Sequence, residues 1–112
     1  KGITLVPKIN DVELPVSIAI PLSLIVNELA TNSYKHAFKT TGKGTIEIEL
    51  SENEKMVELI VKDSGPGFTP QSTKRSSVGL EILDALIEQI NATLVYNNTN
   101  GSTYKITFRN SL

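Results

Sequence analysis

Three polar residues with useful chemistry occur at helical spacing early in the chain: Glu28, Asn32 and Lys35. At 3.6 residues per turn, the spacing i, i+4, i+7 places them in one narrow sector of a helix. An asparagine carbonyl is a neutral oxygen ligand that suits Mg²⁺ bound to phosphates, a lysine can meet phosphate charge, and Glu28 could act on a water or an attacking group. The same residues are common on a merely solvated helix face, so both interpretations stay open.

Another acid, Asp63, ends a hydrophobic run and is followed by Ser-Gly-Pro-Gly. A carboxylate only accepts hydrogen bonds, so Asp63 could take the amino group of adenine and would repel the keto oxygen of guanine. Gly65 and Gly67 would let the backbone approach a flat base closely. Because Asp, Ser, Gly and Pro are also the usual turn residues, a plain turn after a strand is the alternative.

Gly79 stands at the start of a predicted second helix. It would leave room for phosphate oxygens at unpaired backbone N–H groups, where the helix dipole favours anions; a helix-initiating loop without a ligand is the alternative. Lys74 and Arg75, in the preceding loop, could clamp phosphate or simply form a solvated loop tip. No GxxxxGK[ST] sequence is present, which excludes a P-loop nucleotide site.

Two single residues are further candidates. Thr103 could place a hydroxyl near Asp63, although hairpin turn chemistry accounts for its Gly-Ser-Thr segment equally well. His36 is the only imidazole, and its place near the end of the first predicted helix favours a structural role over a catalytic one. With one histidine and no cysteine, a zinc site built from thiolates or several imidazoles is excluded.

Hydrophobic periodicity predicts the elements that must position these residues. In chain order they are a strand at 3–9 interrupted at Pro7, a helix whose start is bracketed by Pro15 and Pro21 and which ends before Gly42 and Gly44, strands at 45–50 and 56–62, a loop at 69–77, a helix at 78–91, and strands at 93–97 and 102–108. The predicted inward stripes are Leu22, Ile25, Leu29 and Ser33 on the first helix, and Leu80, Leu83, Ile87 and Ile90 on the second. These elements predict an α/β (α+β) two-layer sandwich, with helices on one face of a mixed, largely antiparallel sheet.

The composition bounds the function. A chain of 112 residues without repeats or linkers predicts one domain over 1–112. A net charge of −1 gives no reason to expect a general nucleic-acid-binding protein, which would usually carry an excess of basic residues. No apolar run approaches the length that crosses a bilayer, no signal-peptide pattern opens the chain, and the absence of cysteine fits a reducing cytosol.

Three segments together resemble the N, G1 and G2 boxes of the GHKL ATPase superfamily: NELATNSYKHAF at 27–38, DSGPGF at 63–68 and SVGLEIL at 77–83. More narrowly, they are similar to the catalytic ATP-binding domain of bacterial sensor histidine kinases of the HWE-related subgroup. The resemblance covers nearly the whole chain. It implies a histidine-kinase-like ATPase fold with ATP between the first helix and a lid, working in the cytoplasm.

The resemblance implies roles residue by residue. Glu28 matches the water-activating acid of hydrolysing relatives such as gyrase, and Asn32 matches the residue that holds Mg²⁺. The nucleotide-binding positions implied are Asn32, Lys35, His36, Asp63, Gly65, Gly67, Phe68, Lys74, Val78, Gly79, Leu80 and Thr103. Many members have two glycines in the third box, where this chain has only Gly79.

The implied activity is transfer of the γ-phosphoryl group of Mg-ATP to a histidine on a separate dimerisation domain, for relay to a response regulator. An anti-sigma-factor-type serine kinase, a GHKL ATP hydrolase and a non-catalytic interaction module stay open as alternatives. The chain starts without methionine and carries no acceptor-histidine helical segment, so we expect the catalytic domain of a longer kinase. The expected partners are ATP, that dimerisation domain and a response regulator, with neither nucleic acid nor a membrane contacted by this domain.

Overall fold

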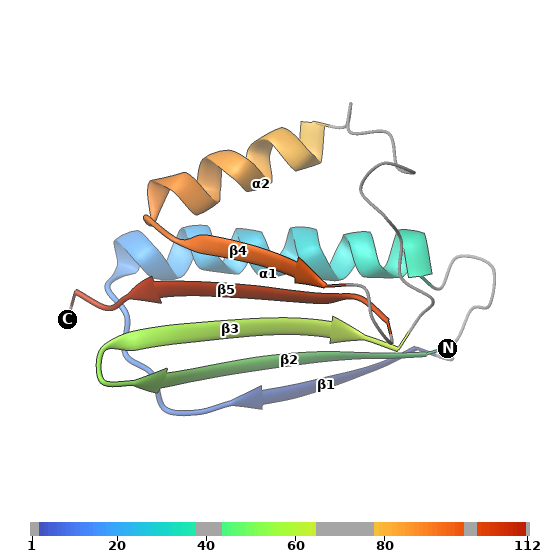
Figure 1. Cartoon of the computed structure of the whole chain (residues 1–112), viewed down its shortest axis with the longest axis horizontal. Coiled ribbons are helices and arrows are strands. Elements are labelled where there is room, and N and C mark those ends of the chain that lie inside the picture. Colours follow the sequence, from blue (N-terminus) through green and yellow to red (C-terminus); the bar gives the residue numbers. More distant parts are fainter. Residues whose placement is uncertain (1–2, 38–43, 65–77, 98–100, 112) are drawn as a thin grey trace.

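The computed structural model describes residues 3–37, 44–64, 78–97 and 101–111, and for 3–6, 36–37 and 78–81 it describes the backbone alone. In chain order, the elements are β1 (Ile3–Ile9), α1 (Val16–Ala37), β2 (Gly44–Asn53), β3 (Met56–Asp63), α2 (Val78–Gln89), β4 (Thr93–Asn97) and β5 (Thr103–Arg109). Within these residues the strands form one sheet in the order β1-β2-β3-β5-β4, and both helices lie over the same face (Figure 1). Only β1 and β2 pair in parallel, which confirms the predicted mixed, largely antiparallel two-layer sandwich.

The first strand differs from its prediction. β1 runs without a break through Pro7, which lies in register with Ile48 of β2, so the interruption predicted at Pro7 is wrong. Proline has no N–H to give to a sheet, but β1 is an outer strand of the described sheet and has a strand neighbour on one side only. Pro7 therefore costs little at this position.

The long helix starts between the two prolines that were predicted to bracket its start. α1 begins at Val16, and the carbonyl of Pro15 accepts hydrogen bonds from the N–H groups of Ile18 and Ala19, both at 2.9 Å. Pro21 is buried inside the helix, where it has no N–H to give to the carbonyl four residues earlier. The helix therefore starts between Pro15 and Pro21, as predicted, and Pro21 lies in its second turn.

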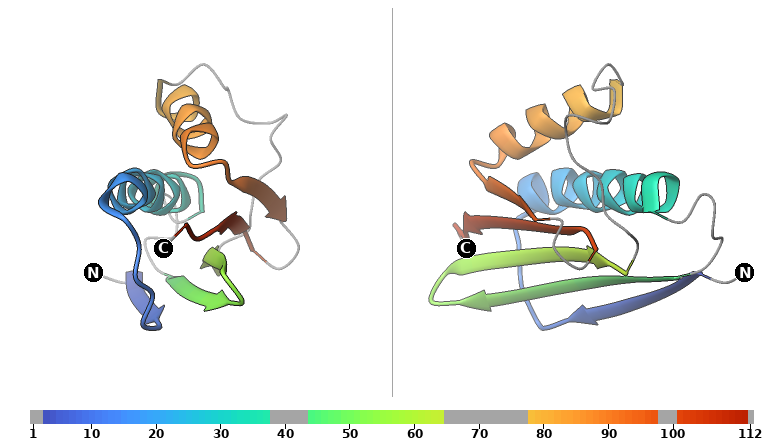
Figure 2. Two further views of the ribbon diagram at one scale, coloured as in Figure 1. Left: turned by 90° about the vertical axis from the view of Figure 1, so that its left-hand side faces the viewer. Right: turned by 45° about the vertical axis from the view of Figure 1, so that its right-hand side comes forward.

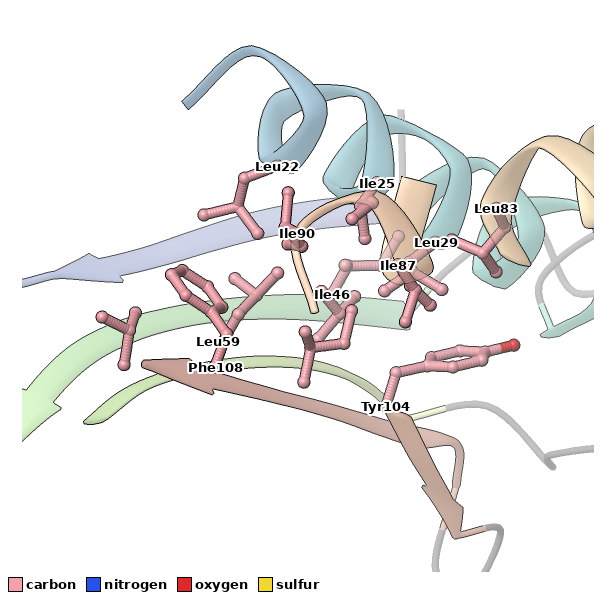
Figure 3. Close-up of a cluster of buried hydrophobic side chains, with 13 residues drawn as sticks. Leu22, Ile25, Leu29, Ile46, Leu59, Leu83, Ile87, Ile90, Tyr104 and Phe108 are labelled. Atoms are coloured by element: carbon pink, nitrogen blue, oxygen red, sulfur yellow. The ribbon is translucent and has the colours of Figure 1, made fainter. Parts of the chain in front are cut away.

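Helix α1 is longer and more apolar than the sequence analysis allowed for. The stretch Val16–Lys35 is long and apolar enough to cross a membrane by those two measures, so the statement that no run approaches that length was too strong. The inner stripe of the helix, however, is buried against the sheet and α2, as in the core helix of a globular domain (Figure 3). Packing within the domain therefore accounts for this part of the helix's apolar character.

The core lies between the two helices and the sheet and confirms the predicted stripes. Its buried apolar side chains are Leu22, Ile25, Leu29, Ile46, Val57, Leu59, Val61, Leu83, Ile87, Ile90, Tyr104, Ile106 and Phe108. Burying an aliphatic side chain of this size contributes about 1.5–3 kcal/mol. Ser33 continues the stripe of α1 and is buried as predicted, whereas the side chain of Leu80 lies outside the described residues.

Hydrogen bonds fix the end of α2 and the segment that leads into α1. α2 ends at Gln89, two residues before its predicted end, and Asn91 follows with a positive φ of 54°. The N–H of Ala92 donates to the carbonyl of Ile87 at 3.0 Å, which completes a helix-ending Schellman motif. Before α1, the backbone carbonyl of Glu13 accepts a hydrogen bond of 2.9 Å from the buried Asn110 side chain, which ties the approach to α1 to the end of β5.

Candidate functional site

Four chain segments that are far apart in sequence meet at one end of the molecule. α1 and β3 run in the same direction, so the C-terminal turns of α1 and the C-terminal end of β3 lie at the same end, on the right in Figure 1. The start of β5 and the first turn of α2 lie at this end as well, and a second view agrees (Figure 2). Helix α1 packs on β3. The fold therefore brings the polar helix residues and the acid at the end of β3 to one region.

Asp63 is the last residue of β3 and is only 2% exposed. Its Oδ1 atom accepts a hydrogen bond of 3.2 Å from the backbone N–H of Ser102, and its own N–H donates to the Ser102 carbonyl at 2.9 Å. A buried carboxylate is costly unless it is bonded, so these contacts make the burial tolerable and fix the orientation of the group. Asp63 is therefore an oriented carboxylate at the end of β3, and its place at the end of a strand is as predicted.

The hydroxyl residue beside Asp63 is Ser102, not the predicted Thr103. Ser102 is 1% exposed, and it follows Gly101, whose φ of 94° turns the chain into β5. Along β5 the core side chains alternate with outward ones, which places the half-buried Thr103 on the outer face, paired with Lys62. Gly101 is the sequence signal that could have pointed to Ser102. The residue that follows such a turn comes close to the end of the neighbouring strand, which here is Asp63 of β3.

Two tyrosines that the sequence analysis did not single out stand next to Ser102. The Tyr96 hydroxyl lies 2.9 Å from Ser102 Oγ, and the rings of Tyr96 and Tyr104 are 4.9 Å apart at an angle of 43°. Burial raises the pKa of the Tyr104 hydroxyl above its ordinary value, and Tyr96 and the Asp63 charge raise it further. Tyr104 therefore stays a neutral hydroxyl beside the acid. Tyr96 and Tyr104 pair across β4 and β5, which follows from the strand register and from no local sequence pattern.

The polar residues of α1 lie beside its buried stripe. Ser33 on the stripe is buried, and its Oγ atom has no hydrogen-bond partner among the described residues. Asn32, one position earlier, and Glu28 are half-buried, whereas Lys35 is exposed. This placement confirms the prediction that the three polar residues flank the apolar stripe rather than belong to it. The predicted His36 lies in α1, but its side chain is outside the described residues.

A metal ion at this end would take most of its ligands from a bound phosphate-bearing molecule and from water. Over the described ranges, no three His, Cys, Asp or Glu side chains gather in a way that could hold a metal ion. Asn32 can offer one neutral amide oxygen, which fits Mg²⁺ that takes its remaining ligands from phosphate oxygens and water. Asn32 therefore suits an Mg²⁺ ion that a phosphate-bearing ligand brings with it.

The rest of the predicted site falls in or near segments beyond the described residues. Gly79 is the second residue of α2, in its first turn, as the sequence predicted. The predicted contacts that lie outside the described residues or side chains are Gly65, Gly67, Phe68, Lys74, Val78 and Leu80, together with the loop residue Arg75.

Known proteins share this architecture. The blue-light activated histidine kinase EL346 of Erythrobacter litoralis superposes with a TM-score of 0.90 at 23% identity, over 99% of this chain and 36% of that one. The Acinetobacter baumannii histidine kinase AdeS gives a TM-score of 0.79 at 16% identity, over 98% and 55% of the two chains. At these identities the likeness shows the fold.

Sequence comparison finds relatives and a family. The anti-sigma F factor of Bacillus thuringiensis (strain Al Hakam) is 24% identical, over 77% of this chain, which spans 66% of the length of that relative. Residues 17–112 match the model of the histidine kinase-, DNA gyrase B- and HSP90-like ATPases. That match takes in α1, Asp63 and Ser102, the residues that form the site described above. The chain therefore belongs to the family of histidine kinase-, DNA gyrase B- and HSP90-like ATPases.

Proposed function

We propose that this chain is the ATP-binding catalytic domain of a two-component sensor histidine kinase of the HWE-related subgroup. It transfers the γ-phosphoryl group of Mg-ATP to a histidine on a separate dimerisation domain, from which a response regulator takes it. The observation that carries the proposal is that the buried, oriented Asp63 at the end of β3 lies at the same end of the molecule as the C-terminal turns of α1, which carry Asn32 and Lys35. The fold shared with histidine kinases supports it.

In this proposal the two halves of the site bind the two ends of ATP. Asp63 accepts a hydrogen bond from the adenine amino group, and Asn32 offers its amide oxygen to Mg²⁺, which neutralises phosphate charge. Lys35 adds a cation, and Glu28 is placed to act on the attacking group. Phosphoryl transfer needs mainly positioning and charge neutralisation, so few protein groups suffice.

The remaining site residues keep their predicted roles as part of the proposal. Gly65 and Gly67 shape the pocket of the base, Phe68 is a further nucleotide contact, and Gly79 admits phosphate oxygens at the first turn of α2. His36, Lys74, Val78 and Leu80 complete the nucleotide contacts. The domain comprises 1–112 and works in the cytoplasm, in contact with its dimerisation domain and a response regulator.

The nature of the phosphorylated product tests the proposal. We expect incubation with Mg-ATP and the dimerisation domain of the parent protein to give a phosphoprotein that is labile in acid and stable in base, because phosphohistidine hydrolyses in acid. ATP labelled at the γ-phosphate and acid treatment before electrophoresis provide the measurement. Steady release of phosphate without a labelled protein would instead indicate an ATP hydrolase, and no ATP binding would indicate a non-catalytic module.

A serine kinase is the second candidate, favoured by the likeness to an anti-sigma F factor. Its product would be a phosphoserine on a separate antagonist protein, which survives acid. The same assay therefore separates the two kinases, since the label either disappears or persists on acid treatment.

The assignment of Ser102 over Thr103 gives a paired prediction. We expect Ser102→Ala to weaken ATP binding roughly five-fold, the scale of one lost hydrogen bond of about 1 kcal/mol. Thr103→Val keeps the shape of a residue on the outer face of the sheet, so it should leave the affinity unchanged. Isothermal titration with ATP measures both, and the reverse order of effects would return the role to Thr103.

A further inference from the structure

We propose that Tyr96 is a positioning residue for purine selectivity, because its hydroxyl sets the direction in which the Ser102 hydroxyl donates beside Asp63. The inference rests on the proposed function, since it concerns how the same site distinguishes adenine from other purines. Tyr96 belongs to β4 and lies outside the three sequence boxes. It acts on the base through Ser102.

Ser102 connects Tyr96 to the acid, with its hydroxyl against Tyr96 and its backbone N–H on Asp63. The Tyr96 hydroxyl is 2.9 Å from Ser102 Oγ, and the Ser102 N–H is 3.2 Å from Asp63 Oδ1. Ser102 is almost fully buried and Tyr96 is half-buried, so little bulk water competes for these groups. The Tyr96 ring packs on Tyr104, which holds the phenol in place. A change at Tyr96 therefore reaches the Asp63 end of the sheet through one intervening side chain.

The direction of the hydrogen bond follows from acidity. Either oxygen could donate, but a phenol is more acidic than an aliphatic alcohol and is the better donor. When the Tyr96 O–H donates to Ser102 Oγ, the hydrogen of Ser102 is left to point elsewhere. Asp63 can only accept, so the two neighbouring residues then present an acceptor and a donor side by side.

This pair of groups matches one edge of adenine. Adenine carries a donating amino group at C6 next to an accepting ring nitrogen, N1. Hypoxanthine, the base of inosine triphosphate, has a keto oxygen at C6 and an N–H at N1, which reverses both polarities. Without the Tyr96 hydroxyl, Ser102 could rotate and accept from that N–H, either directly or through one water. The selectivity for adenine would then depend on Asp63 alone.

Binding of ATP and inosine triphosphate to matched variants tests the inference. In Tyr96→Phe, which keeps the ring and removes the hydroxyl, we expect the ratio of the inosine triphosphate to the ATP dissociation constant to fall roughly five-fold, the scale of one hydrogen bond. Tyr34→Phe is the control, because Tyr34 is 56% exposed on α1 and this change removes the same group elsewhere. In a Ser102→Ala background, Tyr96→Phe should change the ratio no further.

Each outcome bears on the inference separately from the proposed function. If the original chain binds ATP and Tyr96→Phe lowers only the unfolding temperature with an unchanged ratio, the hydroxyl is structural and the inference is overturned. If the original chain binds neither nucleotide, the proposed function itself fails. If Tyr96→Phe does not fold, 3-fluorotyrosine at position 96 keeps ring and hydroxyl and makes the hydroxyl a stronger donor. The ratio should then hold or rise, and a fall would overturn the inference.

Discussion

Replacing Asp63 with asparagine should weaken ATP binding by about 1–3 kcal/mol, roughly 5- to 150-fold in the dissociation constant. The carboxylate offers a charged acceptor to the adenine amino group, whereas the amide of asparagine offers a neutral oxygen and can turn its NH₂ towards the base. The substituted side chain could still accept the Ser102 N–H through its amide oxygen, so the fold should survive. Isothermal titration with ATP, together with circular dichroism, measures both effects.

Asp11→Asn is a matched control for this variant. Asp11 is exposed and follows β1, at the end of the sheet away from Asp63, so the same chemical change there should leave the affinity unaltered. Equal ATP affinity in Asp63→Asn and the original chain would remove Asp63 from the site.

Asn32→Ala should abolish magnesium-dependent phosphorylation of the acceptor histidine. The half-buried amide is the proposed protein ligand of Mg²⁺, and alanine offers no oxygen in its place. Alanine is a better helix former than asparagine, so α1 should persist and the free energy of unfolding should change by no more than about 0.5 kcal/mol. Phosphoryl transfer over a range of magnesium concentrations and urea unfolding provide the two measurements.

Asn10→Ala removes the same side chain from an exposed position at the far end of the sheet. Its transfer rate should match that of the original chain. Undiminished transfer by Asn32→Ala would contradict the metal role of Asn32 and leave the ion to other groups.

Much of the fold could be predicted because burial imposes the spacing of each element. The stripe of α1 from Leu22 to Ser33 and the stripe of α2 are buried where helical periodicity placed them. Ile46, Ile48 and Leu50 alternate along β2 and contribute to the core or pack against it. These patterns depend on the period of one element at a time, so the sequence contains them directly.

Local rules alone do not explain how the fold accommodates Pro7 and Pro21. A proline such as Pro7 would disrupt an inner strand, but an outer strand pairs on one side only. Nothing in the local sequence says that β1 lies at the edge of the described sheet. Pro21 removes one helical donor, but α1 is fixed by its packing on either side of that position, by Ile18 before it and by Leu22 after it. Tertiary position decided both outcomes.

The positions of the proposed site residues were predictable where one element alone sets them. Asp63 ends β3 and is buried, and Asn32 lies beside the buried stripe of α1, as strand and helix periodicity indicated. Ser102 was missed in favour of its neighbour, because the face that each residue occupies depends on the turn at Gly101. The contact of Tyr96 with Ser102 depends on two strands coming together, which no local pattern contains.

The outer position of β1 has a practical consequence for anyone who shortens this chain. The family match begins at residue 17, so β1 falls outside it, yet β1 pairs with β2 from Ile3↔Gly44 to Ile9↔Leu50. Trimming the chain to the matched region would leave β2 with a row of unsatisfied backbone groups and no proline to interrupt it. With Pro7 and the exposed Lys8, β1 shields that border from intermolecular strand pairing, and its loss would favour aggregation of the shortened chain.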